Sequence, residues 1–267
     1  MTSFLGITRE AVFSPGRVDD DSAILLAVAD QLRRNGKTVE TVRGDDARWP
    51  EPGRDAIVFT MAQGERSLAR LQEWERNGIR VINSSTGILN CQRHRTVPLL
   101  SAARVAFPPS LLVATHDAVE LPTWIGGGAW VKRGDVHATD SDDVVFADSE
   151  RAVDDALRRF TVRGIARAVV QQHVTGRVFK FYAVRGSFFH CVDGSELSEE
   201  ALARMDALGQ QAALALGVEI YGGDCVVDLT GGLTLIDLND WPSYARCRFA
   251  AASAIAAYVG ISKATNT

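Results

Sequence analysis

The sequence predicts an α/β protein with three lobes. Strand-like and helix-like segments alternate through the first third, a pattern typical of a parallel sheet covered by helices. The middle third contains several short strand-like segments and one helical segment. The last third contains two pairs of strands separated by a long helical segment, which indicates antiparallel pairing. We expect lobes at residues 1–88, 89–174 and 175–267.

In the N-terminal lobe, the first strand is predicted at Ser3–Ile7. A helix should begin near Asp19, because three consecutive acids suit a helix N-terminus, and it should end at Gly36. A second helix should end at Gly78. Further strands are expected at Thr38–Val42, Asp55–Thr60 and Ile79–Asn83.

Two loops of this lobe follow predicted strands, where open parallel sheets bind their ligands. One runs from Thr8 to Asp21 and the other from Thr60 to Arg66. No Gly-x-Gly-x-x-Gly motif follows the first strand, which disfavours a dinucleotide site. The loops carry several polar and turn-forming residues: Arg9, Ser14, Pro15, Gly16, Arg17, Gln63 and Gly64.

The remaining two lobes begin after a helix predicted from Leu89 to Ala103, which must end before Pro108. Central strands are expected at Ser110–Val113, Ala129–Lys132, Val144–Ala147 and Ala168–Val174, with a helix at Ser149–Phe160. The C-terminal lobe should contain strands Val178–Val184 and Ser187–Val192, a helix Ser198–Leu216, a second hairpin, and a last helix from about Ser243 to Tyr258.

Composition excludes several functional classes. The chain has 267 residues, 46% of them hydrophobic, which is enough for a substantial core. The net charge is −4 without any block of Lys or Arg, so nucleic acid is not expected as a partner. No apolar run could span a bilayer and no secretion signal precedes the first strand, so we expect a cytoplasmic protein without a membrane partner. The four cysteines are scattered, as in reduced cytoplasmic proteins.

The second hairpin of the C-terminal lobe carries a predicted metal site. Asp224 lies on its first strand, while Asp237 and Asn239 lie on the second strand and share a face because strand side chains alternate. Two carboxylates and an amide oxygen form a set that Mg²⁺ favours, with phosphate oxygens and water as its other ligands. Asp228, beside the Gly231-Gly232 turn, is better explained as a turn former.

Two segments of the central lobe suit a nucleotide. Lys132 ends a strand, where its ammonium could reach phosphate oxygens. The run 168–174 is apolar and then rich in amides, so that an adenine could stack on its edge and bond to its backbone.

Together these segments resemble the ATP-grasp superfamily over most of the chain. The resemblance implies the ATP-grasp fold, with a parallel N-terminal lobe, a small central lobe and a C-terminal antiparallel sheet, and it implies ATP and one or two Mg²⁺ as cofactors. It assigns Lys132 to the phosphates, Gln171, Gln172, His173 and Val174 to the adenine, and Asp224, Asp237 and Asn239 to the metal. Arg93 stands where the family has a second ATP-facing lysine.

Within the superfamily, residues 131–141 and 178–184 look like segments of inositol tris/tetrakisphosphate kinases. This likeness implies that His137 and Lys180 act near the transferred phosphoryl group. A second similar branch contains ribosomal-protein glutamate ligases and glutathione synthase. That branch usually has Arg where Lys180 stands and a Gly-rich loop that this chain lacks after Lys132, so we expect a kinase of a small molecule.

Two alternatives stay open, a carboxylate–amine ligase acting through an acyl phosphate, and a nucleotide-binding protein without catalysis. In each enzymatic case the acceptor should be a small anionic molecule. The candidate acceptor contacts, besides His137, are Arg9, Arg17, Arg185, Arg246 and Arg248.

Overall fold

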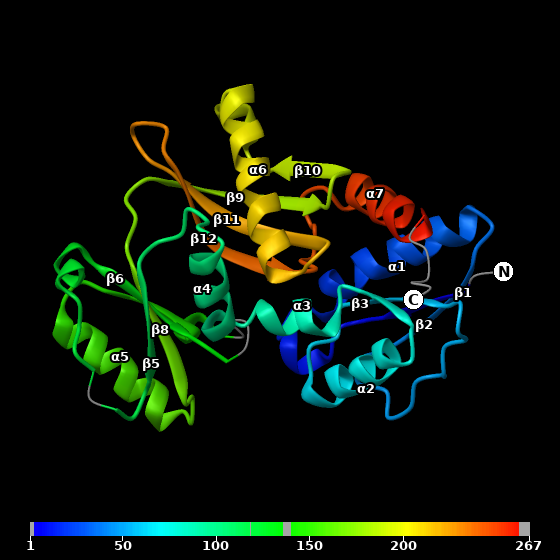
Figure 1. The fold of residues 1–267 in the computed structure, drawn as a ribbon, viewed down its shortest axis with the longest axis horizontal. Coiled ribbons are helices and arrows are strands. Elements are labelled where there is room, and N and C mark those ends of the chain that lie inside the picture. Colours follow the sequence, from blue (N-terminus) through cyan, green and yellow to red (C-terminus); the bar gives the residue numbers. More distant parts are fainter. Residues whose placement is uncertain (1–2, 118, 136–139, 262–267) are drawn as a thin grey trace.

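The computed structural model describes residues 3–117, 119–135 and 140–261, and it confirms the predicted fold class. The described residues form three four-stranded sheets, one in each lobe. Figure 1 shows the N-terminal lobe (blue to cyan), the central lobe (green) and the C-terminal sheet (yellow-green to orange), with helix α4 lying where they meet. No helix within these residues has both the length and the apolar character needed to cross a membrane.

The N-terminal sheet is parallel throughout, with strand order β2-β1-β3-β4. Its strands are buried on both faces at β1 and β3, which explains their continuous apolar sequence. The elements of this lobe are β1 (Ser3–Ile7), the 3-10 turn η1 (Ala11–Phe13), α1 (Val18–Arg34), β2 (Thr38–Val42), β3 (Ile57–Thr60), α2 (Glu65–Arg76) and β4 (Arg80–Ile82).

The helix predicted at Leu89–Ala103 is instead two helices. Helix α3 spans Ser85–Asn90 and α4 spans Arg93–Ala102. Helix α3 begins early because the hydroxyl of Ser84 accepts a hydrogen bond from the Gly87 amide at 3.0 Å. The chain turns at Cys91 and Gln92, and Gln92 then caps α4 in an extended conformation. This break places Arg93 in the first turn of α4, at the junction of the lobes.

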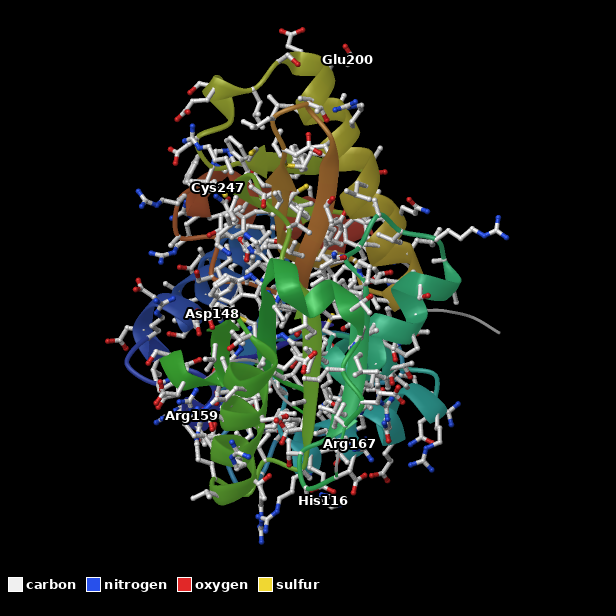
Figure 2. The ribbon with its side chains drawn as sticks, turned by 90° about the vertical axis from the view of Figure 1, so that its left-hand side faces the viewer. His116, Asp148, Arg159, Arg167, Glu200 and Cys247 are labelled. Carbon is white, nitrogen blue, oxygen red and sulfur yellow. The ribbon has the colours of Figure 1, made fainter. Side chains whose placement is uncertain are left out.

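The central sheet is antiparallel, with strand order β5-β8-β6-β7. Helix α5 packs on one face through an apolar cluster that includes Val131 and Phe160. Figure 2 views this lobe from its outer side, where the labelled Asp148, Arg159 and Arg167 are exposed. The elements are β5 (Ser110–Ala114), η2 (Thr123–Gly127), β6 (Ala129–Arg133), η3 (Ser141–Asp143), β7 (Val144–Ala147), α5 (Glu150–Val162) and β8 (Arg167–Gln172).

The C-terminal sheet has strand order β10-β9-β11-β12, and all of its pairs are antiparallel. Helix α6 covers one face, where Phe179 and Phe181 are buried, so the intervening Lys180 points to the other face. The elements are β9 (Arg177–Val184), β10 (Phe188–Cys191), η4 (Gly194–Glu196), α6 (Glu199–Leu216), β11 (Ile220–Val227), β12 (Leu233–Asp240) and α7 (Arg248–Ile261).

The last helix, α7, begins later than predicted and belongs to a core that joins two lobes. Residues 243–247 form a turn instead of helix, with Tyr244 at a φ of 50°. The buried Tyr244 hydroxyl lies 2.7 Å from the Ala183 carbonyl oxygen and 3.0 Å from that of Tyr221. Helix α7 then packs against α1, as Figure 1 shows, so that the N-terminal lobe and the C-terminal sheet share one apolar core.

Candidate functional site

The three predicted metal ligands lie together on strands β11 and β12. Asp224 is directly opposite Asp237 in the antiparallel pair, and Asn239 lies two residues further along β12. The pairing shifts between Asp224 and Cys225, leaving Ile236 as an extra residue in β12. Such a bulge re-aims neighbouring groups at a strand edge. Here it leaves two carboxylates and an amide along one face, while Leu238 is fully buried on the other.

A basic side chain contacts each of the two carboxylates. The ammonium of Lys180 lies 2.7 Å from Oδ1 and 3.0 Å from Oδ2 of Asp224. The guanidinium of Arg93 lies 3.2 Å from Oδ2 of Asp237 and also donates to the Arg133 carbonyl at 3.2 Å. Lys180 comes from β9, the strand beside β11, and Arg93 from the first turn of α4. Two negative and two positive charges therefore alternate within one short stretch of the site.

The electrostatics of Asp224 reflect this crowding. Burial raises the pKa of its carboxyl, and the facing Asp237 raises it further. The Lys180 ammonium acts in the opposite direction, because it stabilises the carboxylate.

Lys132 is the most buried cation of the site, with an exposed fraction of 6%. Its ammonium donates to Gln171 Oε1 at 2.6 Å and to the carbonyl of the bulged Ile236 at 3.1 Å. Burial lowers the pKa of Lys132 to about 8, because desolvation disfavours the charged form. Its ammonium thus joins the central sheet to strand β12.

Two cavities meet at these charges. The first, of about 470 Å³, lies between the central and C-terminal sheets. The second, of about 640 Å³, lies between the C-terminal sheet and the loops that follow β1 and β3 in the N-terminal lobe. Both cavities are lined by Arg93, Lys180, Asp224 and Asp237. Below they are called the nucleotide cavity and the acceptor cleft.

Comparisons with known proteins identify the fold of this architecture. Neither the family models nor the curated proteins contain a match. Among solved structures, D-alanine–D-alanine ligase from Bacillus anthracis, solved with ATP, has a TM-score of 0.68 at 11% identity and covers 91% of this chain and 87% of its own. A RimK domain ATP-grasp protein from Sphaerobacter thermophilus has a TM-score of 0.70 at 16% identity, covering 96% and 99%.

A third similar structure is the ATP-grasp ligase PsnB in complex with a precursor peptide and AMPPNP. Its TM-score is 0.66 at 16% identity, over 97% of this chain and 96% of that one. These matches extend over nearly the whole length of both chains. The chain has the ATP-grasp fold. At these identities the likeness establishes the fold alone.

The donor set of this ATP-grasp site suits Mg²⁺. Asp224 and Asp237 face each other across the strand pair, and Asn239 adds an amide oxygen on the same face. Hard oxygen donors of this kind, with room left for water and phosphate, are what Mg²⁺ requires. All three side chains line the acceptor cleft, and the two carboxylates also line the nucleotide cavity. Lys132 lines the nucleotide cavity but not the acceptor cleft.

The predicted adenine segment also lines the nucleotide cavity. All four of its residues, Gln171, Gln172, His173 and Val174, border it. Gln171 is 2% exposed, and its side-chain oxygen accepts a hydrogen bond from the Lys132 ammonium. The sequence analysis missed Trp130, which lies two residues before Lys132 on the same face of β6. Its indole donates to His173 Nδ1 at 3.2 Å. The alternation of strand side chains from Lys132 could have identified it.

The predicted acceptor contacts divide into two groups. Arg9 and Arg17 line the acceptor cleft. The structure does not bring the other three arginines to either cavity. Arg185 bonds to the Val218 carbonyl and lies near Glu219, Arg248 pairs with Asp20, and Arg246 is exposed. His137 lies outside the described residues.

Two interlobe contacts that the sequence analysis did not identify shape the acceptor cleft. Gln63 donates to Asp240 at 3.1 Å, and Arg9 donates to the Trp241 carbonyl at 2.8 Å. Arg9 also pairs with Asp21 at 3.2 Å. The end of β12 is thereby attached to both loops of the N-terminal lobe. Only the three-dimensional structure reveals these pairs, because their members are far apart in sequence.

Proposed function

We propose that this chain is an ATP- and Mg²⁺-dependent ligase that joins a carboxylate to an amine through an acyl phosphate. The observation that carries the proposal is the shared wall of the two cavities. A triphosphate entering the nucleotide cavity ends beside Asp224, Asp237 and Lys180, and the same groups face the acceptor cleft. A phosphoryl group can thus be handed across the shared wall to a second molecule.

In this mechanism the protein contributes mainly position and charge. Lys132 and Arg93 would neutralise phosphate oxygens, and Lys180 would lie beside the transferring phosphoryl group. Bound Mg²⁺, held by Asp224, Asp237 and Asn239, would supply further charge stabilisation for that group. The substrate carboxylate attacks the γ-phosphorus and ADP leaves. An amine then attacks the acyl carbon, and phosphate leaves as the amide bond forms.

The ligase is preferred over the kinase that the sequence favoured. The three ATP-grasp structures described above include two that are named as ligases, and one of these was solved with a peptide substrate. The kinase interpretation depends on Lys180 and on His137, which lies outside the described residues. Lys180 is compatible with either acceptor, because its ammonium can stabilise charge on a hydroxyl or a carboxylate oxygen alike.

An ADP-release assay with trapping tests the proposal. The purified protein is incubated with Mg·ATP and a panel of carboxylic acids, with and without amines, and hydroxylamine is added as a general nucleophile. A ligase should release ADP and form a hydroxamate from its acid substrate, because hydroxylamine intercepts the acyl phosphate. ADP release with inositol phosphates or other polyols, without any acid, would instead establish a kinase.

A further inference from the structure

A third cavity, of about 530 Å³, lies beside the acceptor cleft and has no role in the proposed chemistry. It is formed where β1, β2 and β3 end, which is the edge at which parallel sheets bind ligands. Its walls come from the three segments that follow those strands and from the first two turns of α2. The lining residues are Glu10, Val12, Phe13, Gly44, Asp45, Asp46, Ala47, Trp49, Gly64, Glu65, Arg66, Ser67 and Arg70.

We call this third cavity the distal cavity. It adjoins the acceptor cleft along a narrow ridge formed by Phe13 and by the residue pairs Arg9-Glu10 and Gln63-Gly64. Phe13 lines both cavities. Residues that are neighbours in the chain line different cavities on the two sides of the ridge. Arg9 and Gln63 line the cleft, whereas the next residues, Glu10 and Gly64, line the distal cavity. The two cavities are therefore adjacent.

The ridge is rigid. The buried carboxylate of Glu10 accepts hydrogen bonds from the Gln63 amide at 3.0 Å, the Gly64 amide at 3.0 Å and the Ser67 hydroxyl at 2.5 Å. A side chain at position 64 would begin only 2.7 Å from that carboxylate, so glycine keeps the ridge low. The shape of the crossing is thus fixed by the folded chain.

Hydrogen bonds also fix the opposite wall of the distal cavity, which the segment after β2 forms. The Trp49 indole donates to the Arg43 carbonyl at 3.0 Å, and Arg70 donates to the Trp49 carbonyl at 3.0 Å. Asp45 accepts from the Ala11 amide at 2.9 Å through Oδ2. Ligand binding to a preformed cavity of this kind costs little free energy for ordering, because the walls are already in place.

The chemistry of the distal cavity suits a cation on an apolar stem. Its apolar lining includes Val12, Phe13 and Trp49, while Asp45, Asp46 and Glu65 are exposed at its rim. Asp45 and Asp46 each use Oδ2 to bond backbone amides of the loops, which leaves Oδ1 available to a ligand. Arg70 forms an ion pair with Glu51. Among the residues that line the distal cavity, Arg66 is the other cation, and it faces three rim carboxylates.

We propose that the distal cavity binds the far, positively charged end of an elongated, peptide-like substrate whose reacting end lies in the acceptor cleft. The inference rests on the proposed ligase function for its use of the cleft. It assigns to this chain a substrate longer than a single amino acid. The cleft selects the reacting group, and the distal cavity selects a lysine-like or arginine-like tail.

Calorimetric binding of four synthetic tetrapeptides tests the assignment without requiring turnover. Lys-Gly-Gly-Gly and Gly-Gly-Gly-Lys are compared with their Glu counterparts, each titrated into the full chain saturated with Mg²⁺ and AMPPNP. Having the charge at either end allows for both directions of binding. One Lys peptide should bind about tenfold more tightly than its Glu counterpart, as expected from three rim carboxylates that each contribute modestly.

Two variants locate the effect. Combining Asp45→Asn, Asp46→Asn and Glu65→Gln should remove the preference for Lys, while the amide oxygens keep the loop hydrogen bonds. The same charge change on the central lobe, Asp148→Asn, Glu150→Gln and Asp154→Asn, should leave the preference intact, since these exposed residues lie on another lobe. Ala47→Trp, which fills the distal cavity, should weaken binding of the Lys peptide and leave the affinity for AMPPNP unchanged.

Equal binding of Lys and Glu peptides, or no peptide binding by a protein that binds AMPPNP, would overturn the inference. So would a Lys preference that survives in the triple variant of the rim. These outcomes are distinct from a failure of the ligase proposal, which would appear as ADP release without hydroxamate formation or as no ADP release with any acid.

Discussion

The substitution Asp237→Asn separates the role of this carboxylate in function from its role in stability. It preserves the shape of the side chain and one oxygen, but it removes the charge that faces Asp224 and Arg93. In the proposed site, the change deprives Mg²⁺ of one of two anionic ligands. We therefore expect it to weaken Mg²⁺-dependent nucleotide binding while leaving the fold in place.

The magnitude follows from the surroundings of the side chain. An interaction with a charged, partly buried group contributes about 1.5–3 kcal/mol, which corresponds to about 10- to 150-fold in affinity for Mg·AMPPNP. Stability responds to two opposed terms. The substitution removes the repulsion between Asp237 and Asp224, but it also removes the ion pair with Arg93. Because the Asp237 and Asp224 side chains are about one-fifth exposed, the terms should cancel to within about 1 kcal/mol.

Calorimetric titration with AMPPNP, with Mg²⁺ and without it, measures the first quantity, and chemical denaturation in metal-free buffer measures the second. Asp228→Asn is the matched control, since this carboxylate lies in the same hairpin but bonds to its own turn at Thr230 and Gly232. If Asp237→Asn retained Mg·AMPPNP affinity to within about threefold, a difference of less than 1 kcal/mol, Asp237 would not be a metal ligand.

Three further predictions concern the surrounding residues. In AMPPNP titrations between about pH 7 and 9, nucleotide affinity should fall as the pH rises through about 8, because Lys132 then loses its proton. The Lys132→Arg variant should keep a constant affinity over this range, and a wild-type affinity that does not fall would contradict the assignment. Lys180→Met should lower the rate of ADP release at saturating substrate by about 100-fold but change AMPPNP affinity by less than about threefold; the reverse pattern would place Lys180 in the nucleotide site alone. Tyr244→Phe should cost about 1–2 kcal/mol in urea denaturation, since two buried carbonyl groups lose the hydroxyl between them; unchanged stability would refute that role.

The sequence predicted the lobes and most of the strands because their signals are local. Strand-like runs on both sides of the Gly231-Gly232 turn identified β11 and β12, and the alternation of strand side chains then gave the shared face of Asp237 and Asn239. The turn assignment of Asp228 is likewise confirmed, since its Oδ1 accepts from Thr230 and Gly232. Such features depend on residues within a few positions of one another.

The features that the sequence could not reveal depend on distant partners. Helix α7 begins at Arg248 because Tyr244 inserts its hydroxyl between two strands of the C-terminal sheet, a tertiary contact that overrides the helical composition of the segment. The pairing of Arg93 with Asp237 requires the break between α3 and α4. The attachment of Arg185 to the backbone at Val218 removed an arginine that had looked available for substrate.

Locating the metal tests the central claim most directly. Crystals grown with Mn²⁺ in place of Mg²⁺, together with AMPPNP, should show an anomalous peak within about 2.0–2.3 Å of oxygen atoms from Asp224, Asp237 and Asn239, with phosphate oxygens completing the coordination. A metal ion bound by other residues, or a nucleotide bound outside the nucleotide cavity, would contradict this assignment.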